Sequence, residues 1–127
     1  MRQEWCHNFF MTHYLISFDD GAMTFPEEEL PEVANAAHAV MREAQNAGVW
    51  IFGGGLHSTE FLDVVNERAT VNIQPVTDNH QLIGGFSIIN VASREQAIKW
   101  AGKIAAACRC PQTVREIMDD PEAHTPK

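Results

Sequence analysis

The order of its periodic segments constrains this chain more than any other feature. Apolar side chains recur at helical spacing from Val33 to Ala44 and again from Ala97 to Ala105. Aromatic and β-branched residues predict strands between and around these helices, at residues 12–18, 49–52, 60–66, 69–76, 85–91 and 113–118. The order is strand, helix, strand, hairpin, strand, helix, strand.

This order predicts an α+β fold of the ferredoxin-like, split βαβ kind with an inserted hairpin. Right-handed crossovers place both helices on one face of the sheet. Gly48 is expected to stop the first helix, and Ser93 with Gln96 forms a capping box that starts the second. The run Gly53-Gly54-Gly55 is expected to end the second strand.

The length of 127 residues suits one domain. Residues 11–119 contain all of the periodic segments and form the predicted domain. Residues 1–10 lack the basic start and continuous apolar stretch of a signal peptide, so we expect an extension outside the core. Residues 120–127, with two prolines, are expected to be a flexible tail.

Charge and cysteine content exclude several classes of function. The net charge of −8 disfavours nucleic acid and anionic membranes, and no apolar run approaches the roughly 20 residues of a membrane helix. Three cysteines without a framework spacing indicate reduced thiols and a cytoplasmic protein. Cys108 and Cys110 lack further ligands nearby, so two incidental thiols are favoured over a metal site.

The uncovered face of the sheet predicts a homodimer. If the helices cover one face of the sheet, the other face should be polar. In residues 86–91, however, Phe86 and Ile88 point to one face and Ile89 and Val91 to the other, and in the first strand Leu15 points away from its apolar neighbours, so both faces carry large apolar side chains. A second copy of the chain is the simplest cover for such a surface. A ligand cavity between two sheets would explain the same pattern, and both can coexist.

Several segments together resemble the DGPF branch of the YCII-related family. Ala47–Ser58 (AGVWIFGGGLHS) is similar to that branch's AGV…GGGLHPS segment, and Leu82–Val91 (LIGGFSIINV) is similar to its QLGGFYVIDV strand. A helix like Glu95–Ala101 and a strand like Val114–Met118 follow, so that the resemblance covers most of residues 11–118. One departure is clear: Val76-Thr77-Asp78 is followed by a shortened loop without the Gly-Pro-Phe of the family.

The resemblance implies a dimeric α+β barrel, with two ferredoxin-like subunits packed sheet to sheet. It also implies a link to enzymes, since a few YCII-type relatives eliminate halide from aromatic degradation intermediates with a His and an Asp. Most members have no established reaction, and fold alone does not define function.

Three residues are candidates for catalysis. His57 follows the glycine run at a strand end, where an imidazole can serve as a general base, although an exposed loop histidine would look the same. Asp78 matches the family's VTD step, and its alternative is an Asx turn. His38 corresponds, with an offset of one residue, to a histidine that YCII-type relatives carry in the first helix; its alternative is a half-buried structural histidine.

Trp50, Phe52, His80 and Phe86 are expected to line a pocket for a small molecule. No metal or cofactor motif is present, and we expect none to be used. Two functions follow. The first is a cofactor-independent lyase or isomerase acting on a hydrophobic or aromatic metabolite by His/Asp acid–base chemistry. The second is a non-catalytic ligand-binding or regulatory dimer.

Overall fold

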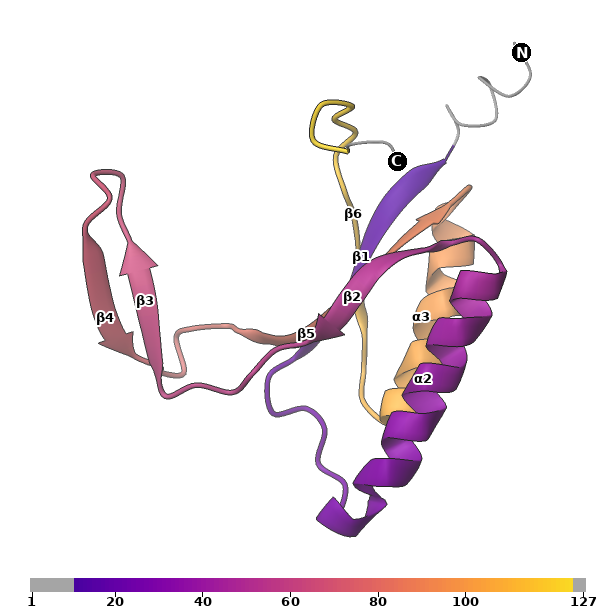
Figure 1. Cartoon of the computed structure of the whole chain (residues 1–127), viewed down its shortest axis with the longest axis horizontal. Helices are drawn as coiled ribbons and strands as arrows, with labels where there is room; N and C mark the ends of the chain where they lie inside the picture. The colour runs from indigo at the N-terminus through magenta and orange to yellow at the C-terminus, as the bar shows by residue number, and fades with distance from the viewer. Residues whose placement is uncertain (1–10, 125–127) are drawn as a thin grey trace.

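The computed structural model describes residues 11–124 as two helices, a four-stranded sheet and a separate hairpin (Figure 1). The elements in chain order are β1 (Thr12–Asp19), η1 (Glu27–Glu29), α2 (Leu30–Asn46), β2 (Trp50–Gly55), β3 (Phe61–Val65), β4 (Val71–Pro75), β5 (Ile83–Val91), α3 (Arg94–Cys108) and β6 (Thr113–Glu116). The extension predicted at residues 1–10 and the end of the predicted tail, residues 125–127, lie outside the described residues.

The four-stranded sheet has the order β2-β5-β1-β6, and all of its neighbouring strands are antiparallel. Both helices lie together on one side of it (Figure 1). This is the ferredoxin-like α+β arrangement that the segment order predicts. No helix within residues 11–124 has the length and apolar content needed to cross a membrane.

The core lies between the sheet and α3. Tyr14 and Ile16 of β1 and Ile89 and Val91 of β5 are buried, and they pack with Ala97 and Ala101 of α3. Because alanine adds little bulk, α3 approaches the sheet closely along this stripe. The alternate residues of β1 and β5 must therefore point away from the helices.

The helix ends follow the local chemistry of the sequence. Gly48 has φ +76°, and the amide of Val49 donates to the Ala44 carbonyl at 3.0 Å, which closes the end of α2. At the start of α3 the Ser93 hydroxyl accepts from the Gln96 amide at 3.2 Å. The Gln96 side chain accepts from the Ala92 amide, one residue before the expected partner.

Apolar side chains do occupy the helix-free face of the sheet, as the alternation predicted. Cross-strand pairing places Leu15 opposite Ile88, and Phe52 is also opposite Ile88. Phe52 is 63% exposed, and its ring lies 6.0 Å from that of Phe86. This face also carries polar residues, His13 and Asn90 among them.

The β3–β4 hairpin forms a sheet of its own and stands apart from the body, at the far end of the molecule from the helices (Figure 1). Its turn is held by Asn66, whose side-chain oxygen accepts from the amides of Arg68 and Thr70, each at 2.9 Å. The hairpin prediction is confirmed, and local hydrogen bonds define its shape.

Residues 120–124 form a turn in which the His124 amide donates to the Asp120 carbonyl at 3.0 Å. The His124 ring lies 4.7 Å from that of His13 on β1. Desolvation lowers the pKa of His13, and the neighbouring His124 lowers it further, against a smaller opposite effect of Asp119.

We expect Ile16→Ala to lower the free energy of unfolding by about 2–5 kcal/mol, because it leaves a cavity in the core. Ile98→Ala is the matched control on α3, since Ile98 is 43% exposed, and it should change stability by less than about 0.5 kcal/mol. Urea denaturation measures both. Equal effects of the two substitutions would contradict the assigned core.

We expect the protein to lose stability on acidification below pH 6.5, in part through His13. In the unfolded chain this imidazole binds its proton near pH 6.5, whereas the folded protein holds it neutral to lower pH. Between the lowered pKa of folded His13 and its pKa in the unfolded chain, the unfolded state therefore binds more protons. The free energy of unfolding rises with pH through this range, and the contribution of His13 is fully present above it. Urea midpoints from pH 5 to pH 8 should show a shallower slope for His13→Gln; parallel profiles would contradict this.

Candidate functional site

A pocket opens between α2, α3 and the sheet, which we call the helix–sheet pocket. Its volume is about 290 Å³, close to the lower end of the range of small-molecule sites, about 300–1,000 Å³. Its wall is mainly apolar. Phe18, Met41, Trp50, Ile89, Trp100 and Ile104 are among its lining residues.

The aromatic wall of the pocket depends on glycines in the strands beneath it. A Cβ atom on Gly53 would come within 2.9 Å of the Trp50 indole and 2.5 Å of the Phe86 carbonyl oxygen. On Gly84 or Gly85 it would come within 2.8 or 2.7 Å of the Phe18 ring. The two rings therefore occupy space that only glycine leaves free.

The glycine run was expected to end the second strand, and this was wrong. Gly53, Gly54 and Gly55 belong to β2 and pair with β5, and none of them has a positive φ angle. Gly53 allows close packing rather than a turn, because the space beside it has no room for a side chain, while its backbone conformation does not require glycine.

Few polar side chains line the helix–sheet pocket. His38 comes from α2, Ser87 from β5, Cys108 from the end of α3 and Gln112 from the following loop. Burial raises the pKa of the Cys108 thiol, and the nearby Cys110 raises it further. A thiol held protonated is a poor nucleophile. His38 is the one histidine among the described residues that line the pocket.

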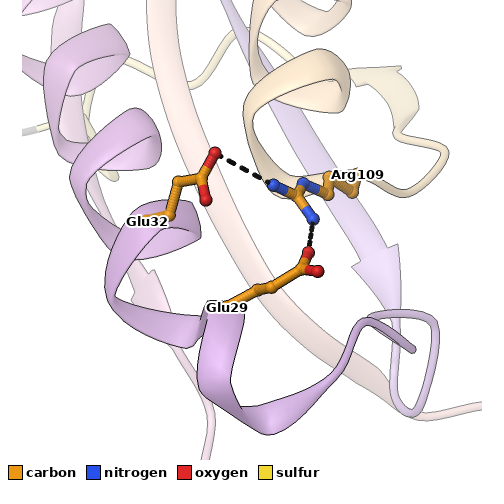
Figure 2. Close-up of polar contacts among 3 residues, drawn as sticks. All are labelled: Glu29, Glu32 and Arg109. Carbon is orange, nitrogen blue, oxygen red and sulfur yellow. Dashed lines mark hydrogen bonds and ion pairs between the residues drawn. The ribbon is translucent and has the colours of Figure 1, made fainter.

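An ion-pair cluster ties the two helices together where Cys108 lines the pocket. Arg109, in the left-handed conformation at φ 59°, pairs with Glu29 and with Glu32, the latter at 3.5 Å (Figure 2). The cation thus lies at the C-terminal end of α3 and the carboxylates at the N-terminal end of α2, as the helix dipoles favour. All three side chains are partly exposed, so the cluster contributes at most about 1 kcal/mol.

Of the predicted site residues, His38, Trp50 and Phe86 are among those that line the helix–sheet pocket. Phe86 does so from β5 with its ring on the helix-free face, 6.0 Å from the ring of Phe52. Phe52 belongs to the helix-free face and does not line it. His57 is exposed in the loop after β2 and does not line the helix–sheet pocket. It also lies outside a second, polar pocket of the structure. Asp78 and His80 lie in that second pocket.

The second pocket is a polar depression between the end of β1 and the loop before β5. Asp19, Asp20, Asp78 and His80 are among its lining residues. The Thr77 amide donates to His80 Nδ1 at 3.0 Å, so this histidine closes its own loop. Within residues 11–124 no three His, Cys, Asp or Glu side chains gather closely enough to hold a metal ion.

Sequence reasoning missed three residues that line the helix–sheet pocket, Phe18, Trp100 and Cys108. The signal for Phe18 was present, since Gly84-Gly85 on the neighbouring strand leaves room for a ring. Trp100 lies three residues after Ala97, one of the buried residues of α3. This spacing also fits an ordinary core position.

The fold and the pocket define an α+β protein of the ferredoxin-like kind with a helix–sheet pocket. The model of the YCII-related domain family matches residues 11–119. The chain therefore belongs to the YCII-related family, as its motifs indicated. No curated protein matches it.

We expect Gly53→Ala to destabilise the protein by about 1–3 kcal/mol, because the new methyl group forces the Trp50 ring and the β5 backbone apart. It should also change the tryptophan emission. Gly54→Ala is the matched control, since a Cβ there meets nothing within 4 Å, and it should leave stability and emission close to the wild type. Thermal unfolding followed by fluorescence measures both, and identical melting temperatures would contradict the packing described.

Proposed function

We propose that this protein binds a small hydrophobic or aromatic metabolite in the helix–sheet pocket and acts on it by acid–base chemistry, with His38 as the proton-transferring group. The observation that supports this is the combination of a mainly apolar pocket, walled by Trp50, Trp100 and Phe18, with one imidazole among its lining residues. Aromatic walls favour a flat apolar ligand.

His38 suits the role because of its position. It is exposed on α2 and lines the pocket as well, so it can exchange its proton with water and with a bound molecule. An imidazole takes up and releases protons near neutral pH. The reaction class that follows is proton abstraction or proton transfer on the ligand, of the lyase or isomerase type and without a cofactor.

The non-catalytic alternative uses the same pocket. A ligand-sensing or regulatory protein needs the apolar wall but no proton transfer. No Asp or Glu is among the described residues that line the pocket together with His38. His57 and Asp78 are not part of the proposed mechanism, because neither lines this pocket; their catalytic role stays a prediction.

We further propose that the protein is a cytoplasmic homodimer formed through the helix-free face of its sheet. The support is the row of apolar side chains there, Leu15, Phe52, Phe86 and Ile88, which a second sheet would cover. Sedimentation velocity should give the mass of two chains.

A thermal-shift screen of small aromatic acids, phenols and enols, followed by mass spectrometry of each stabilising compound, tests the function. We expect at least one compound to be both bound and converted, and His38→Gln to lower turnover by about 10²-fold or more while binding persists.

His57→Gln is the decisive comparison, since it removes another exposed imidazole that lies outside the pocket lining. A loss of turnover with His57→Gln and none with His38→Gln would contradict the proposal. Stabilising compounds that are never converted would support the non-catalytic alternative.

A further inference from the structure

The β3–β4 hairpin carries a mainly apolar face that the other helices and strands of residues 11–124 do not cover. Strand pairing places Val65 opposite Val71, and Phe61 opposite Pro75. Because side chains alternate along a strand, these residues share one face with Ile73 and with Asp63, the charged residue that pairs with Ile73. Phe61, Val65, Val71 and Ile73 are each 56–65% exposed. We call this surface the arm face.

The opposite face of the hairpin is different. Val64 is the one large apolar residue on it with substantial exposure, at 39%, and it pairs with Asn72, while Leu62 pairs with Gln74. The hairpin is therefore amphipathic, with an apolar side that resembles the inner side of a packed sheet.

The helices and other strands of residues 11–124 leave the arm face without extensive cover. Neither β3 nor β4 makes an extensive contact with any other helix or strand, and the hairpin projects away from the body (Figure 1). A two-stranded hairpin is marginally stable by itself in water. The Asn66 turn sets its shape but covers none of its apolar surface.

We propose that the arm face docks on a second copy of this chain, as an arm that reaches across the dimer interface. This inference rests on the homodimer proposed above. The area argues for the same partner: a stable interface buries about 800 Å² from each subunit, and Leu15, Phe86 and Ile88 on the helix-free face are already half-buried. Phe52 on the same face is 63% exposed, and the four exposed apolar side chains of each arm would add to the area that the dimer buries.

Position argues in the same direction. The helices occupy one side of the sheet, while the hairpin and the helix-free face lie on the side away from them (Figure 1). A two-fold axis beside the helix-free face would bring each arm to the other subunit, so that both uncovered apolar surfaces of the chain are buried in one symmetric assembly.

Two neighbouring valines provide a matched test on the full-length chain. Val65→Asp places a second carboxylate on the arm face, two residues from Asp63, and Val64→Asp places the same group one residue earlier on the opposite face. We expect Val65→Asp to raise the dimer dissociation constant, measured by sedimentation equilibrium, by at least about tenfold, and Val64→Asp to change it less than about threefold. Circular dichroism and melting temperature establish that both variants fold.

A second measurement needs no variant. In wild-type protein the amides of β3 and β4 should exchange with deuterium more slowly at concentrations where the dimer forms than at dilutions where it dissociates. This readout also decides the case in which Val65→Asp unfolds the hairpin.

The outcomes separate the two proposals. A wild-type dimer with equal dissociation constants for both variants, or with hairpin exchange independent of concentration, overturns the arm and leaves the homodimer standing. A wild-type monomer at all concentrations overturns both. Neither outcome bears on ligand binding in the helix–sheet pocket.

Discussion

The structure depends on the burial of one face of the four-stranded sheet against α3. Ile16, Ile89 and Ala97 are at most 1% exposed, and this stripe determines which side chains of β1 and β5 face the helices and which face away. Each large apolar side chain buried there contributes about 1.5–3 kcal/mol. A shift of one residue in strand register would exchange the two faces and lose this contribution.

The same packing explains why a pocket forms on the helix side. Alanines of α3 pack on the sheet, whereas the Trp50 and Phe18 rings, which line the pocket, lie against glycines of the strands. Large rings packed against glycines leave space between them that smaller side chains do not fill. The glycines at positions 53, 84 and 85 thus act through volume: a Cβ atom on any of them would enter the space that the Trp50 or Phe18 ring occupies.

Much of this fold was predictable from the sequence, because local patterns determine it. Helical spacing, the Gly48 stop and the Ser93 cap located both helices, and alternation on β1 and β5 distinguished the two sheet faces. The site was less predictable. His57 and Asp78 sit beside sequence signals for a functional loop, yet the structure places His38 at the pocket, since which loops approach a cavity depends on tertiary packing. The extended conformation of the glycine run depends likewise on pairing with β5, which no local pattern encodes.

The claim that the helix–sheet pocket binds a small aromatic molecule can be tested by the fluorescence of its own tryptophans. In a Trp5→Phe background, Trp50 and Trp100 are the remaining tryptophans of the chain, and both line the pocket. Titration with 2-naphthol should change their emission saturably, with one site per chain. A linear, non-saturating decrease, equal to that of free N-acetyltryptophanamide, would contradict the account.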